Sequence, residues 1–233
     1  MRDRPDQPDS DLGTDPGSSH RQFLVFEGRH DQPAEENIRS FIDGMRRTST
    51  VFGSDLVFDH DVWDITHHVR RRASDKRVRL RFFELDPDES GRWRPLSEPF
   101  AAFTKALIRY FHGTHPSKQP QHRLRALLAL YQALVERTGT CDPIRISTAD
   151  LDAAAQHLSD THLAGSVHRY GSMLVRTADF LDKHGLCVAR LAWKNPFKAI
   201  SSVDRVGPEF DALRLKRLPS RAALEAIAKA YWA

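Results

Sequence analysis

The sequence predicts a mainly α-helical protein, and three observations on its 233 residues support this fold class. Four segments after Ser97 place apolar residues at the spacing of one helix face. Strand-like alternation is confined to a short stretch before residue 95. Residues 1–20 mix aspartates with Pro, Gly and Ser, a composition that does not bury an apolar core. We therefore expect a disordered N-terminal tail, a small mixed α+β region and a four-helix bundle.

Residues 21–95 are expected to form the small accessory region of mixed structure. Within it, residues 35–47 carry apolar side chains at helical spacing, which predicts a helix. The short apolar run 56–58 is interpreted as a strand. A second strand is predicted over residues 77–85, because apolar side chains alternate there with arginines. The turn-forming residues that follow this strand, and then Trp93, predict a small hairpin.

Residues 96–198 are expected to form a compact helical domain, an ordinary size for one hydrophobic core. The first helix is predicted to begin near Pro99 and the second near Pro120, with Gly139 ending the second. The third helix opens with a capping box that spans residues 147–150. Short connections join all of these helices, so antiparallel packing of neighbours is expected.

The fourth helix carries the strongest functional signal. Arg169, Arg176 and Lys183 recur every seven residues, so all three project from the side opposite the apolar stripe. Their line is roughly 20 Å long, comparable with a few phosphate spacings along a duplex. Ser166 and His168 lie at the N-terminal end, where free backbone N–H groups and the helix dipole favour a phosphate. These five residues are the first candidates for DNA contact.

The charge distribution favours a polyanionic partner. The formal net charge is only +4, because aspartates in residues 1–20 offset a more basic remainder of the chain. Arg123, Arg125, Lys194 and Lys198 are second candidates for contact with double-stranded DNA. Two alternatives remain open, because a solvated charged surface, or a helical interaction module that binds an acidic protein, would present the same cations.

Three motifs in a fixed order then identify a family. GSVHRYGSMLVRTADFLDKHG at residues 165–185 is followed by Asn195-Pro196 and by KRLPSRAALEAIAKAYW at residues 216–232. This order resembles the core-binding region of tyrosine recombinases of the phage-integrase family, over about residues 97–233. The resemblance implies a SAM-like helical bundle that clamps duplex DNA during recombination and integration. It also implies other recombinase protomers on the DNA as partners.

The same resemblance explains why a new helix begins near the end of the chain. It implies that residues 199–233 are a linker and the first helix of a catalytic domain, with Ser220 as the helix cap. The chain would then be truncated before the catalytic tyrosine domain, and it is expected to bind DNA without cleaving it. A C-terminal helix that docks on the bundle is the alternative.

No catalytic, metal or cofactor site is predicted within this chain. Residues 67–70 match the His-x-x-Arg pattern of the resembled family, but they precede the bundle and neighbour strand-like sequence, so we interpret the match as chance. A complete small enzyme that uses this motif is the rival hypothesis. His112 and His115 lack a second pair at zinc-site spacing, and we expect them at the surface or as caps.

The sequence also favours a cytoplasmic protein with no membrane partner. Its longest apolar runs fall far short of the roughly 20 residues that cross a bilayer. No apolar segment follows a basic start at the N-terminus, as a secretory signal would require. The two cysteines, Cys141 and Cys187, are expected to be buried thiols.

Overall fold

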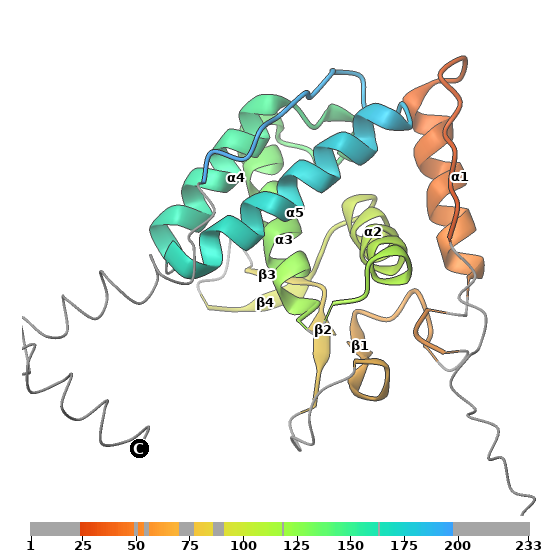
Figure 1. Ribbon diagram of the computed structural model, residues 1–233, viewed down its shortest axis with the longest axis vertical. Helices are drawn as coiled ribbons and strands as arrows, with labels where there is room; N and C mark the ends of the chain where they lie inside the picture. The colour runs from red at the N-terminus through yellow and green to blue at the C-terminus, as the bar shows by residue number, and fades with distance from the viewer. Residues whose placement is uncertain are drawn as a thin grey trace, which may run out of the picture.

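The computed structural model describes residues 24–48, 51–53, 56–69, 77–85, 91–117, 119–162 and 164–197. Among these residues it contains five α-helices and two short antiparallel ladders, so a mainly helical protein with a small sheet region is confirmed (Figure 1). No described helix has the length and apolarity needed to span a membrane. The predicted tail at residues 1–20 and the predicted linker and helix at residues 199–233 lie outside the described residues.

The first helix of the accessory region forms where the apolar spacing predicts it. Helix α1 (Ala34–Arg47) buries Ile38, Phe41 and Met45. Glu35 and Glu36 lie in its first turn. Acidic side chains at this end complement the helix dipole. The strand expected at residues 56–58 is wrong, because Phe58 lies in a turn and packs its ring against Trp63 at 5.8 Å. A three-residue apolar run does not distinguish a strand from a turn that covers the core.

The alternating stretch at residues 77–85 forms two strands rather than one. Strand β2 (Arg79–Arg81) pairs with β1 (Val62–Asp64), and a 3-10 turn η1 (Thr66–His68) follows β1. Strand β3 (Phe83–Leu85) pairs with β4 (Trp93–Pro95), which confirms the predicted hairpin. The strand divides at Phe82, whose N–H donates to the Asp61 carbonyl while its own carbonyl accepts from the Leu96 N–H, both at 2.9 Å. The predicted alternation is confirmed, since Val78, Leu80 and Phe82 are buried.

The four predicted bundle helices all form. They are α2 (Phe100–Thr114), α3 (Gln121–Thr138), α4 (Thr148–Thr161) and α5 (Ala164–Lys183), with a 3-10 turn η2 (Pro143–Arg145) before α4. Helix α3 ends at Gly139 as predicted, in the left-handed conformation with φ 68°. At the start of α4, the Asp150 carboxylate accepts the Ser147 N–H at 2.7 Å and also binds Arg137 at 2.6 Å. The acid of the capping box therefore also ties α4 to the end of α3.

One hydrophobic cluster contains buried residues of both the accessory region and the bundle. Phe41 on α1 has its ring centroid 4.9 Å from Phe26 in the segment before α1 and 4.9 Å from Phe180 on α5. Tyr110 on α2 has its ring centroid 4.7 Å from the same Phe180 ring. Aromatic packing therefore joins the described parts of residues 21–95 and 96–198.

The segment after α5 turns back over α4 and α5 (Figure 1, blue). The Asp182 carboxylate accepts two backbone N–H groups of this connector, both at 2.7 Å. Further along, the Trp193 indole donates to Asp152 on α4 at 2.7 Å, and the Asn195 amide donates to the His168 carbonyl on α5 at 3.4 Å. The connector thus returns to the N-terminal half of α5, beside the candidate DNA-contacting residues.

Candidate nucleic-acid interface

Helix α5 separates its apolar and cationic residues as the seven-residue spacing predicts. One side is buried in the core; its residues are Val167, Tyr170, Leu174, Ala178 and Leu181. Arg169, Arg176 and Lys183 are all exposed. The helix therefore uses one face for packing and leaves another free to contact a ligand.

A cleft of about 600 Å³ lies between α5, the start of α3 and the loop before α3. We call it the α3–α5 cleft, and its lining residues are Ser117, Gln119, His122, Arg123, His168, Arg169, Ser172, Met173 and Arg176. Four of the nine candidate DNA-contacting residues meet here, although they come from two helices that are far apart in the sequence. Among the described residues that line the cleft there is no aspartate or glutamate.

The three arginines of the cleft have no acidic partner within the described part of the chain, where no ion pair involves Arg123, Arg169 or Arg176. Arg169 donates through Nη1 to the Gln119 side-chain oxygen at 3.2 Å. Burial, and then the neighbouring Arg176, lower the pKa of Arg123 to about 10, so its guanidinium stays charged at neutral pH. Arg123 Nη2 donates to the His115 carbonyl, while its buried Nη1 has no partner in the described residues. The cleft thus holds cations that a bound anion would neutralise.

Two histidines contact the Tyr170 ring, and one of them, His122, lines the cleft. The rings of His122 and His162 lie 5.5 Å and 4.9 Å from the Tyr170 ring, and Arg125 Nη1 donates to the Tyr170 hydroxyl at 3.4 Å. Burial is the main cause that lowers the pKa of His122, and the charges of Arg169 and Arg125 lower it further. Arg125 therefore lies close behind the cleft, although it does not line it.

The remaining candidates do not line the cleft. Lys183 lies one helical heptad beyond Arg176 and borders a different depression, and Ser166 is in the first turn of α5 outside the lining. Lys194 is exposed on the connector, next to the Asn195 that contacts α5. Lys198 lies outside the described residues. Of the predicted DNA-contacting residues, Arg123, His168, Arg169 and Arg176 therefore line the cleft together, and the other described candidates lie outside its lining.

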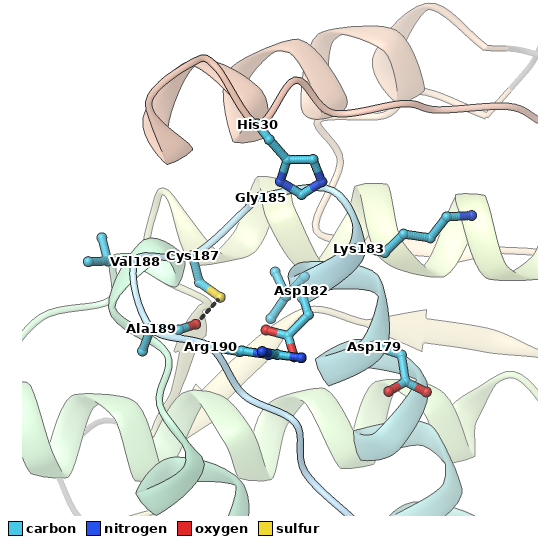
Figure 2. A pocket seen from close by; sticks show the side chains of 10 residues that line it. His30, Asp179, Asp182, Lys183, Gly185, Cys187, Val188, Ala189 and Arg190 are labelled. Atoms are coloured by element: carbon cyan, nitrogen blue, oxygen red, sulfur yellow. Dashed lines mark hydrogen bonds between the residues drawn. The ribbon is translucent and has the colours of Figure 1, made fainter.

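Figure 2 shows the depression that Lys183 borders, which has a volume of about 640 Å³ and mixed charge. In this depression the Asp182 carboxylate accepts the backbone N–H groups of Leu191 and Ala192 in the connector. Cys187 donates its S–H to the Ala189 carbonyl at 3.0 Å, and burial together with Asp182 raises the pKa of this thiol to about 12. The thiol is therefore protonated at neutral pH, and its hydrogen bond lies within the connector itself. Cys141 and Cys187 are each only partly buried, which corrects the prediction of buried thiols.

Two histidine predictions are decided by the fold. His112, expected at the surface or as a cap, is buried and stacks on Phe52 with ring centroids 4.7 Å apart. That prediction is wrong because the accessory region covers this side of α2, a tertiary contact that helix periodicity does not show. His115 is exposed, as are His67 and His68 of the His-x-x-Arg match. Among the described residues, no three His, Cys, Asp or Glu side chains gather in a way that could hold a metal ion.

The sequence interpretation missed several residues of the cleft, above all His122. Its signal is visible in hindsight, since His122 adjoins Arg123 in the first turn of α3. Ser117 and Gln119 lie on the loop before α3, and only the folded chain places them opposite α5. Ser172 completes the polar lining from α5 itself, where its hydroxyl donates to the His168 carbonyl at 2.9 Å.

No protein-family model matches this chain, and neither does a curated protein or a solved structure. The assignment of the α3–α5 cleft therefore rests on the chemistry of its own side chains. These side chains offer guanidinium, imidazole, hydroxyl and amide donors without a carboxylate among them. Such a lining suits an anion with several acceptor oxygens, and a phosphate group fits that description.

Proposed function

We propose that this chain binds duplex DNA through the α3–α5 cleft and the exposed face of α5. The observation that carries the proposal is the group of arginines, Arg123, Arg169 and Arg176, which line one concave surface without an ion pair in the described residues. Guanidinium groups form charge-assisted hydrogen bonds to phosphate oxygens, and each contact releases counterions from the duplex. Contacts of this kind give affinity and register but little choice of sequence.

The proposed biological setting is the N-terminal, DNA-binding portion of a site-specific tyrosine recombinase. Helices α2, α3, α4 and α5 in sequence, followed by a connector that carries Asn195-Pro196, support the resemblance stated for this family. In this setting the four helices form the SAM-like core-binding bundle, and further recombinase protomers bind the same DNA. The proposal gives the described residues a clamping role and no part in strand cleavage.

The proposal is tested by binding of the 233-residue chain to a short labelled duplex, followed by fluorescence anisotropy. Replacing Arg169 and Arg176 together by Ala removes two phosphate contacts, and we expect the Kd to rise about tenfold or more. The matched control removes the same charge from α1 through Arg39→Ala and Arg47→Ala, two exposed arginines away from the cleft. This control should lose little affinity.

Two outcomes of this experiment contradict the proposal. Equal losses in the cleft variant and the α1 variant would mean that only net charge matters. Binding of an acidic polypeptide that duplex DNA does not displace would move the site to an acidic protein partner instead.

A further inference from the structure

The α3–α5 cleft places a titratable ring among its permanent charges. His122 lines the cleft beside Arg123, and Arg169 and Arg176 line it from α5. His122 is neither deeply buried nor freely exposed, so a ligand in the cleft reaches it. This arrangement differs from a simple row of lysines or arginines, whose charge does not change near neutral pH.

We infer that a DNA phosphate bound in the α3–α5 cleft brings a proton onto His122, so that the cleft holds duplex more tightly in mildly acidic solution. The inference rests on the proposed DNA-binding function and adds the way in which that site is regulated. The ligand group is a phosphate diester of the duplex backbone.

Within the described part of the chain, the charged and titratable groups around His122 are arginines and histidines. Helix α3 contributes Arg123 and Arg125, helix α5 contributes His168, Arg169 and Arg176, and His162 follows directly at the end of α4. Of the preceding loop, the described residues that line the cleft are the neutral Ser117 and Gln119, and Lys118 between them lies outside the described residues. In the free protein these neighbours oppose a further positive charge, because no described aspartate or glutamate lines the cleft to offset them.

A bound phosphate reverses this balance. Its negative charge favours the imidazolium form of His122, and the protonated ring offers two N–H donors where the neutral ring offers one. The same phosphate also screens His122 from Arg169, which is among the causes that lower the pKa of His122 in the free protein. Proton binding and phosphate binding therefore strengthen each other at one site.

The sign of the pH effect follows from this linkage. The pKa of His122 is lowered in the free protein and rises when phosphate binds, so binding takes up a proton between the two values. The affinity for duplex should increase as the pH falls through the pKa of the bound form. It should level off below the pKa of the free form. Each unit of difference between the two pKa values corresponds to about tenfold in affinity.

The test measures the Kd of the full chain for a short labelled duplex at fixed salt, between about pH 5 and pH 8. His122→Gln keeps a polar side chain that does not titrate, and His60→Gln removes an exposed histidine before β1 as the matched control. We expect wild type and His60→Gln to tighten about tenfold on acidification and His122→Gln to lose most of that gain. An undiminished gain in His122→Gln overturns the inference.

A second measurement does not depend on any variant. Nuclear magnetic resonance titration of the His122 ring in the intact chain, with and without duplex, should show a higher pKa in the complex. An unchanged His122 pKa overturns the proton linkage while leaving DNA binding intact. Absence of binding at every pH and at low salt would instead reject the proposed function together with this inference.

Discussion

At the scale of single residues, a buried cation joins the accessory region to the bundle. Arg109 on α2 is 2% exposed, and its Nη1 donates to the Met45 carbonyl at 2.9 Å and the Thr48 carbonyl at 2.6 Å. These carbonyls lie at the end of α1, where the Thr48 N–H donates to the Met45 carbonyl at 3.2 Å and Arg109 adds a second donor to it. The guanidinium also lies 5.4 Å from the Trp63 ring centroid, and burial lowers its pKa to about 10, so it remains charged.

We predict that Arg109→Met lowers the free energy of unfolding by about 3 kcal/mol, because the Met45 and Thr48 carbonyls lose the charged donor that Arg109 provides. Urea denaturation followed by circular dichroism measures this loss. Arg39→Met on the exposed face of α1 is the matched control, and it should change stability by less than about 0.5 kcal/mol. Equal stability of the two variants would contradict the capping role of Arg109.

A second residue-scale prediction concerns pH and His112. Burial, and then the charge of Arg123, lower the pKa of His112 to about 4, so the folded state keeps the ring neutral. The unfolded chain takes up a proton near pH 6.5, so stability should fall as the pH drops from about 6.5 to about 4, by up to about 3 kcal/mol. His112→Phe keeps the ring stacked on Phe52 and removes the titration. Stability that falls equally in wild type and His112→Phe over this window would refute the assignment.

At the scale of elements, a glycine on α5 makes room for the returning connector. A Cβ at Gly171 would overlap the Asn195 side-chain oxygen and lie 2.8 Å from Phe197 Cδ2. Asn195 also accepts the Phe197 N–H at 3.0 Å and donates to the His168 carbonyl at 3.4 Å. The Asn195 side chain therefore fixes the connector against α5, next to the cleft.

Gly171→Ala should displace the connector, although Ala is the better helix former by about 1 kcal/mol. Hydrogen exchange of the amides between Leu191 and Phe197 should become faster. Gly44→Ala on α1 is the matched control, since nothing lies within 4 Å of the added Cβ, and it should stabilise the protein. Adding Asn195→Ala to Gly171→Ala removes the overlap with the Asn195 amide and should recover part of the stability lost. Unchanged hydrogen exchange of these amides in Gly171→Ala would contradict the proposed contact between the connector and α5.

At the scale of the whole molecule, helix periodicity predicted most of the architecture. The starts near Pro99 and Pro120, the stop at Gly139 and the two faces of α5 depend on local spacing and backbone chemistry, so the sequence alone shows them. The strand expected at residues 56–58 and the exposed position expected for His112 failed for one reason. Both depend on tertiary contacts between residues distant in helix or strand spacing, Phe58 with Trp63 and His112 with Phe52.

The same reasoning explains what was predictable about the site. The three cations on α5 follow from their seven-residue spacing, and all are exposed. The α3–α5 cleft does not follow from any sequence spacing, because it forms only where the start of α3 lies beside α5. In the structure Arg123, Arg169 and Arg176 line one cleft, and Lys183 borders a different depression.

The central claim is that this cluster binds the phosphates of duplex DNA, and the salt dependence of binding tests it most directly. The slope of log K against log salt concentration is to be measured for wild type and for the combined Arg169→Ala and Arg176→Ala variant. We predict a slope that is less steep in the variant by about 2, because about two phosphate contacts are lost. Identical slopes for the two proteins would contradict the claim.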